Sequence, residues 1–213
     1  MIFDKKYAIF DMDGTLVDSM KYWDHVCCDF IRELGIYEDG LMETVNPMTL
    51  NQMVDYLNGR FNLTLSAETI IGRMRELMRV HYENDVIIKP GVLRFLDSLK
   101  EQGVPMCVAS TTPTNLVELC LDRLDLKKYF SFAVSAETVG KGKTEPDIYL
   151  YAAERLGGTP EETMVFEDAM KAGQTAKRAG FSVTAVYDET SKSEWDAFKS
   201  FADCIVEDWQ TID

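Results

Sequence analysis

Two kinds of hydrophobic spacing divide this chain. Between residues 20 and 88 the apolar positions recur every three or four residues, which is the spacing of one helix face. From residue 89 onward, short apolar runs alternate with helical stretches, and one further apolar run precedes residue 20. No convincing strand occurs between residues 20 and 86, so this part is predicted to be helical. Its three expected helices run from Met20 until Gly35 stops the pattern, around Leu50–Leu57, and over Ala67–Tyr82.

The remainder of the chain reads as strand, helix, strand, helix. The strands are predicted at 7–10, 104–109, 132–135, 164–166, 183–186 and 204–206. The helices are predicted at 92–101, 113–123 with Pro113 as first residue, 147–156, 169–179 and 193–200. This alternation predicts an α/β fold, a Rossmann-like parallel sheet with helices on both faces. Because the first strand belongs to that sheet, residues 1–16 and 89–213 form the expected core domain, and 17–88 form an inserted helical domain.

Composition narrows the class of protein. The 213 residues are 46% hydrophobic and 27% charged, which is ordinary for a soluble globular protein. Lys plus Arg number 22 against 36 Asp plus Glu, and the net charge of −14 argues against nucleic acid and anionic membranes as partners. No apolar run approaches the roughly 18 residues of a membrane span.

Cysteine usage indicates a reducing compartment. The five cysteines contain no CxxC pair, their number is odd, and several lie in apolar periodic segments. Free buried thiols of this kind fit the cytoplasm best. The N-terminal residues MIFDKKYAIF also lack the apolar stretch of a signal peptide. We therefore expect a cytoplasmic protein.

Polar side chains follow the predicted strands at their carboxyl ends, where open parallel sheets bind ligands. The first strand leads into Asp11 and Asp13 within AIFDMDGTLVDS. Two carboxylates about 4 Å apart repel by roughly 4 kcal/mol at an effective dielectric near 20, so a cation, a proton or separation into water must offset the repulsion. The later strands and the segment before residue 147 contribute the other candidates: Ser110, Thr111, Thr112, Lys141, Lys143, Glu167 and Asp168.

These residue types suit phosphoryl chemistry. Three or more carboxylates favour a hard cation such as Mg²⁺, and a metal, a lysine and a hydroxyl together suit the oxygens of a phosphoryl group. Each feature alone has a plainer explanation. Asp11 and Asp13 resemble a turn, Ser110 resembles a helix cap, Glu167 and Asp168 would complement a helix dipole, and a surface lysine is usually solvated.

Taken together, the motifs favour phosphoryl chemistry over these plainer explanations. FDMDGTLVDS, the hydroxyl of Ser110 after a hydrophobic strand, KTEPDIY and VFEDAMKAG, in that order, resemble the four motifs of the haloacid dehalogenase (HAD) superfamily. The helical insertion is similar to the cap domain of subclass I, the group of β-phosphoglucomutase-like phosphatases. The resemblance implies a Mg²⁺-dependent phosphatase that hydrolyses a small phosphorylated metabolite, such as a sugar phosphate, through an aspartyl-phosphate.

The resemblance also implies roles for the carboxylates. Asp11 is the expected nucleophile. Asp13 is the expected general acid and base, with its backbone carbonyl on the metal. Asp168 completes the Mg²⁺ site with Asp11, and Glu167 binds a metal-bound water or assists.

Further residues are expected to bind the phosphoryl group. Ser110 donates to its oxygens, with Thr111 or Thr112 sharing that work. Lys143 holds the oxygens and compensates Asp11, and the KTEPD spacing favours it over Lys141. The backbone of Gly14 and Thr15 approaches and donates to the phosphate.

Positions at which this sequence departs from the HAD motifs help to choose between a phosphatase and the alternative functions. Ala169 stands where many relatives have Ser, so one hydrogen bond to the metal shell is lost. β-Phosphoglucomutases place a histidine where this chain has Trp23, and His25 would point about 200° away on a helix, which favours hydrolysis over a mutase. The presence of Asp13 disfavours a dehalogenase. A phospho-aspartate signalling module needs no helical insertion. We expect a monomer or a weak homodimer.

Overall fold

The computed structural model describes residues 4–38, 41 and 50–212. The chain forms two compact units, Met1–Met20 with Val86–Asp213 (the sheet unit) and Lys21–Asp85 (the helical unit). These boundaries lie inside the predicted insertion of 17–88, because the two connecting segments bond to each other and to the sheet unit. The amide of Asp18 donates to the carbonyl of Ile87 at 2.9 Å, and that of Lys89 donates to Leu16 at 3.0 Å.

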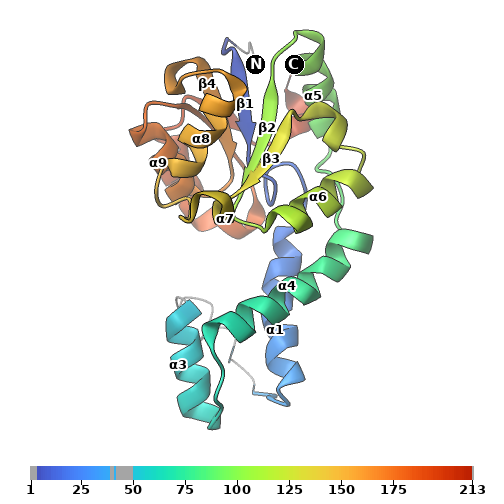
Figure 1. The fold of residues 1–213 in the computed structure, drawn as a ribbon, viewed down its shortest axis with the longest axis vertical. Helices are drawn as coiled ribbons and strands as arrows, with labels where there is room; N and C mark the ends of the chain where they lie inside the picture. The colour runs from blue at the N-terminus through green and yellow to red at the C-terminus, as the bar shows by residue number, and fades with distance from the viewer. Residues whose placement is uncertain (1–3, 39–40, 42–49, 213) are drawn as a thin grey trace. The chain divides into compact units, whose positions relative to one another are not determined.

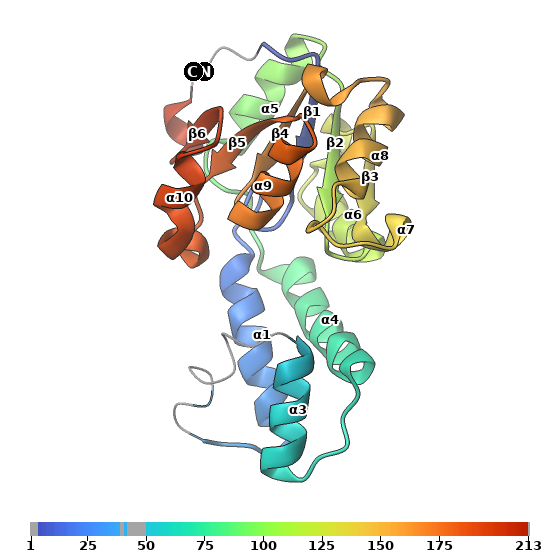
Figure 2. The same ribbon diagram turned by 90° about the vertical axis from the view of Figure 1, so that its left-hand side faces the viewer.

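A six-stranded parallel sheet organises the sheet unit (Figures 1 and 2). Its order is β3-β2-β1-β4-β5-β6, so β1 lies at the centre. The strands are β1 (Tyr7–Phe10), β2 (Met106–Ser110), β3 (Phe132–Ser135), β4 (Thr163–Glu167), β5 (Ser182–Val186) and β6 (Cys204–Val206). All pairings between these six strands are parallel, which confirms the predicted α/β, Rossmann-like fold.

Helices cover both faces of this sheet. Figure 1 shows α8 and α9 over one face and α5 and α6 over the other. The helices are α5 (Val92–Glu101), α6 (Thr114–Arg123), α7 (Ala136–Val139), α8 (Asp147–Leu156), α9 (Met170–Arg178) and α10 (Trp195–Lys199). Short 3₁₀ turns join them: η1 (Lys127–Tyr129), η2 (Pro160–Glu162), η3 (Glu189–Glu194) and η4 (Trp209–Thr211).

Side-chain alternation along the central strands builds a core on each face. Ile9 and Val165 belong to the cluster that also holds buried side chains of α8, α9 and α10. The next residues, Phe10 and Phe166, point the other way and stack with ring centroids 4.4 Å apart. Phe166 in turn lies 5.8 Å from the ring of Trp209. Strands buried on both faces explain the continuous apolar runs in the sequence.

The helical unit has a core of its own. Its helices are α1 (Met20–Glu33), α3 (Leu50–Phe61) and α4 (Ala67–Asn84). Leu57 and Ile70 are fully buried in a cluster that includes Phe30. The helix predicted for Leu50–Leu57 is one turn longer in the structure, where α3 ends at Phe61. The next residue, Asn62, has a φ of 54°, a left-handed conformation that terminates helices.

Two predicted boundaries in the sheet unit were wrong for reasons of proline chemistry. β2 begins at Met106 rather than Val104, because Pro105 has no N–H for the ladder, although its carbonyl accepts from Ala8 at 3.2 Å. Pro113 is not the first residue of α6 but precedes it, with an extended ψ of 142°. The helix predicted for 193–200 divides into η3 and the shorter α10.

Candidate active site

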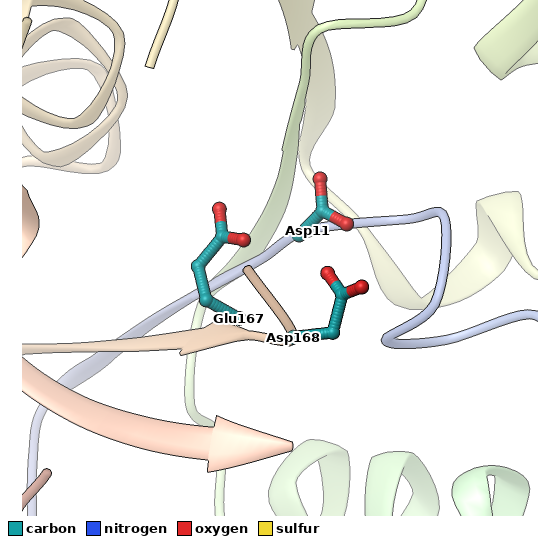
Figure 3. Close-up of side chains that lie close together, drawn as sticks. All are labelled: Asp11, Glu167 and Asp168. Atoms are coloured by element: carbon teal, nitrogen blue, oxygen red, sulfur yellow. The ribbon is translucent and has the colours of Figure 1, made fainter. Parts of the chain in front are cut away.

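The register of β1 against β4 places the first acids of the site side by side. Phe10 pairs with Phe166, and the amide of Asp11 donates to the Phe166 carbonyl at 2.9 Å. Asp11 therefore follows its strand at the level where Glu167 and Asp168 follow theirs, and Figure 3 shows the three carboxylates converging. Each offers an oxygen within 4.8 Å of the others, and all three side chains are buried.

Lys143 supplies the positive charge for this cluster. Its ammonium donates to Oδ1 of Asp11 at 2.5 Å and also to Oε1 of Glu167. Burial by itself would lower the pKa of Lys143, but the two carboxylates raise it above its ordinary value. Lys143 therefore stays charged. Lys141 does not join this cluster, since it is exposed and pairs with Asp147 at 3.0 Å.

Burial and mutual repulsion raise the pKa values of Asp11 and Asp168. Burial, followed by the charges of Glu167, Asp168 and Asp13, raises the pKa of Asp11 well above its ordinary value despite Lys143. Burial and then the charges of Glu167 and Asp188 raise the pKa of Asp168 to about 7. One lysine does not balance three buried carboxylates, and this donor set of hard oxygens fits a divalent cation such as Mg²⁺.

Asp13 lies apart from these three carboxylates in its hydrogen bonding. The chain turns after β1, with the amides of Leu16 and Val17 donating to the carbonyl of Met12. The two oxygens of Asp13 are each bound by a hydroxyl, Oδ1 by Ser19 at 2.6 Å and Oδ2 by Thr112 at 2.8 Å. Asp13 is thus bound by two hydroxyls, whereas Asp11 is bound by Lys143, and the charge of Asp13 still contributes to the raised pKa of Asp11.

The last residue of β2, Ser110, carries a hydroxyl at the carboxyl end of a strand that neighbours β1. Ser110 is buried, and its Oγ accepts from the amide of Thr112 at 3.0 Å, so the cap-like contact is present. Accepting that bond leaves the hydroxyl hydrogen of Ser110 available to a ligand. The side chain of Thr112 is used on Asp13, whereas Thr111 is exposed to solvent.

Gly14 packs directly against the carboxylate of Asp168. Its φ is +75°, and a Cβ at this position would lie 2.3 Å from Asp168 Oδ2. Only glycine therefore fits this turn beside the acid. Thr15 is fully buried, and its carbonyl accepts from the indole of Trp209 at 3.1 Å.

Three contacting residues were not singled out from the sequence. Tyr149 in α8 donates its hydroxyl to Oε1 of Glu167 at 2.7 Å. Burial, and next the charge of Glu167, raise the pKa of this phenol well above its ordinary value, so it remains a donor. Lys89 and Asp188 form a buried ion pair at 2.9 Å, close enough to influence Asp168. Asp188 follows β5, so the strand-end rule that found the other acids would also have found it.

Comparison with known proteins identifies the family. A family model for haloacid dehalogenase-like hydrolases matches residues 5–180. The chain belongs to this family. It is a hydrolase, and the predicted membership of the HAD superfamily is confirmed.

Individual relatives are similar over most of their length. A "Phosphorylated carbohydrates phosphatase" of Thermotoga maritima is 31% identical, with 81% of each chain covered. "Hexitol phosphatase B" of Escherichia coli (strain K12) is 32% identical over 81% of this chain and 78% of its own. Among solved structures, a Thermotoga maritima protein provisionally named beta-phosphoglucomutase superimposes with a TM-score of 0.76 at 27% identity, covering 96% of this chain and 95% of that one.

Within the described residues, no helix combines the length and the apolar character needed to cross a bilayer. The four cysteines whose side chains are described, Cys28, Cys107, Cys120 and Cys204, are free thiols.

Proposed function

We propose that this HAD-like hydrolase is a Mg²⁺-dependent phosphatase of a small phosphorylated metabolite, most simply a sugar phosphate, in a reducing cytoplasm. The observation that carries the proposal is the buried cluster in which Asp11 contacts Lys143 beside Glu167 and Asp168. The phosphatase names of the relatives at 31% and 32% identity support the substrate class. In this proposal the helical unit acts as the cap domain that selects the substrate.

Asp11 is proposed to attack the phosphorus atom. A bond forms between a carboxylate oxygen of Asp11 and phosphorus, while the bond from phosphorus to the ester oxygen breaks. Asp13 gives a proton to that leaving oxygen and then takes one from the water that hydrolyses the aspartyl-phosphate. The hydroxyls of Ser19 and Thr112 orient Asp13 for both transfers.

The phosphoryl oxygens are proposed to meet Lys143 and the hydroxyl of Ser110. Both groups are buried, so their attraction for the developing charge is stronger than in water. Asp11, Asp168, Glu167 and the backbone carbonyl of Asp13 are proposed to hold Mg²⁺. When bound, Mg²⁺ neutralises charge on the acids and on the transferring phosphoryl group.

The test is phosphate release from a panel of phosphorylated sugars, nucleotides and small acids, with and without Mg²⁺. Asp11→Asn is expected to abolish release, because the amide is not a nucleophile for this step. Lys143→Met is expected to reduce kcat/KM at least 100-fold, whereas the matched control Lys141→Met, on an exposed lysine of the same loop, leaves it unchanged. Release that persists without Mg²⁺ and in Asp11→Asn would contradict the proposal.

A mutase is the second candidate, favoured by the structural similarity to the protein provisionally named beta-phosphoglucomutase. It would use the same aspartyl-phosphate but return the phosphoryl group to a second hydroxyl. Conversion of one sugar phosphate into its isomer, with no inorganic phosphate released, would favour this candidate. Trp23, in place of the histidine that the mutases carry, argues for hydrolysis.

A further inference from the structure

The buried phenol of Tyr149 takes no part in the steps above, yet it contacts the groups that carry them. Tyr149 is fully buried in α8 and donates to Oε1 of Glu167 at 2.7 Å. The same oxygen accepts from the ammonium of Lys143. That ammonium also lies 5.7 Å from the centroid of the Tyr149 ring. Tyr149 therefore reaches Lys143 twice, directly by its ring and through Glu167 by its hydroxyl.

We propose that Tyr149 is a positioning residue whose hydroxyl fixes the Glu167 carboxylate and, through it, the ammonium of Lys143. This inference rests on the proposed function, in which Lys143 holds the phosphoryl oxygens. With two donors on Oε1, the carboxylate of Glu167 has one preferred rotation about its terminal torsion. With Lys143 as its only donor the carboxylate can turn, and the ammonium of Lys143 then loses its fixed position between Glu167 and Asp11.

The position of the Tyr149 hydroxyl indicates a role beyond packing. A phenylalanine would fill the same space and keep the ring beneath Lys143, so the hydroxyl is unnecessary for the hydrophobic contacts. A buried phenol needs an acceptor, and this one uses an acid that already binds the lysine of the site. Both donors share Oε1 of Glu167, so the hydroxyl of Tyr149 and the ammonium of Lys143 are tied to the same atom.

The first test compares Tyr149→Phe with Tyr129→Phe. Tyr129 is the matched control because it is also buried and donates to a carboxylate, Oδ1 of Asp97 at 2.7 Å, outside the site. Tyr149→Phe is expected to lower kcat about tenfold while KM changes less than twofold, because the ring and Lys143 remain. Tyr129→Phe is expected to change neither. Equal kinetic effects of the two variants would overturn the proposal.

Action through Glu167 is tested by a double-mutant cycle. In a Glu167→Gln background, Tyr149→Phe is expected to change kcat less than twofold, since the carboxylate that transmits the effect is already gone. The full tenfold loss in that background would show that Tyr149 acts by another route and would overturn the proposal.

A measurement without substrate separates this inference from the proposed function. In ¹⁵N spectra of the lysine ammonium groups, the signal that Lys143→Met removes is expected to shift in Tyr149→Phe and to stay in place in Tyr129→Phe. An unmoved Lys143 signal would overturn the positioning role whatever the activity. If the signal moves while the wild type hydrolyses no phosphate ester, the positioning role stands and the proposed function fails. Should Tyr149→Phe not fold, Glu167→Gln must move the same signal, and its failure to do so overturns the proposal.

Discussion

Gly14 is the residue at which backbone geometry and the site constrain each other most tightly. Its positive φ makes the turn after β1, and the missing Cβ leaves room for the carboxylate of Asp168. Two requirements therefore meet at one position, and a side chain violates both. Gly103 also has a positive φ, +72°, but a Cβ there would meet no atom within 4 Å.

We predict that Gly14→Ala and Gly103→Ala separate these requirements. Both variants should lose about 1–2 kcal/mol of unfolding free energy in urea, the cost of a left-handed alanine. Only Gly14→Ala should also weaken Mg²⁺ binding, by at least tenfold in calorimetric titration, because its methyl group displaces Asp168. Unchanged Mg²⁺ affinity in Gly14→Ala would contradict the placement of Asp168 in the metal site.

Lys143 should also stabilise the fold, because it compensates two buried acids. We predict that Lys143→Met lowers the unfolding free energy by about 3–5 kcal/mol in metal-free buffer, since Asp11 and Glu167 are left as uncompensated buried charges. Urea unfolding checks this, with Lys141→Met as the control that should unfold like the wild type. A Lys143→Met variant as stable as the wild type would mean that water or a counterion already compensates these acids.

From the sequence, strand ends and motif spacing predict which residues belong to the site but not how their side chains contact one another. Strand ends locate Asp11 and Asp168, because the parallel topology brings both positions to one edge of the sheet, and motif spacing points to Lys143 in the loop before α8. They do not reveal that Asp13 is held by Ser19 and Thr112, because side-chain rotamers and a turn decide that contact. Tyr149 lies within KTEPDIY, where it reads as an ordinary apolar helix position.

At the scale of elements, the segment from Val86 to Lys89 is fastened to the sheet unit at several points. A guanidinium nitrogen of Arg123 donates to the carbonyl of Val86. The ammonium of Lys89 donates to the carbonyl of Tyr187 at 2.9 Å and pairs with Asp188. This segment is therefore an integral part of the sheet unit.

The Lys89–Asp188 pair should make stability depend on pH in a defined direction. Burial alone would raise the pKa of Asp188, but Lys89 and the hydrogen bonds from Thr190 hold it below its ordinary value. A carboxyl group whose pKa is lower in the folded state than in the unfolded state stabilises the fold at pH values above its unfolded-state pKa, near 3.9. This stabilisation is lost as the pH falls through the folded-state pKa.

We therefore predict that Asp188→Asn is less stable than the wild type at pH 7 and that the difference shrinks as the pH falls below about 4, through the lowered pKa of Asp188 in the folded state. Urea unfolding across this range measures it. Asp196→Asn is the control, because Asp196 pairs with Lys199 but is 97% exposed, and it should show no such difference. A difference that stays constant down to pH 3 would contradict the assignment to the carboxylate.

The type and order of the elements could be read from hydrophobic period, but their ends depend on particular residues. Asn58 shows why α3 was predicted too short: Asn58 and Gly59 resemble a turn in the sequence. In the structure the Asn58 side chain instead bonds both the amide and the carbonyl of Leu65, each at 2.9 Å. This contact with a residue beyond the helix allows α3 to continue to Phe61.

At the scale of the whole molecule, each unit has its own hydrophobic core. We predict that Leu57→Ala and Leu96→Ala, both at fully buried positions, each cost about 2–5 kcal/mol. In hydrogen exchange, Leu57→Ala should accelerate amides within residues 50–84, and Leu96→Ala should accelerate those of the sheet unit. Equal acceleration throughout the chain in either variant would show that the two units unfold together.

The central place of β1 has a consequence for synthesis on the ribosome. β1 is synthesised first but can pair only after β2 and β4 have been made, and β4 follows it by more than 150 residues. Asp11 therefore emerges long before Glu167 and Asp168, and a nascent chain that has not reached β4 contains the proposed nucleophile without these two acids. Loop closure over so long a separation is slow, so assembly of the site is expected among the last events of folding.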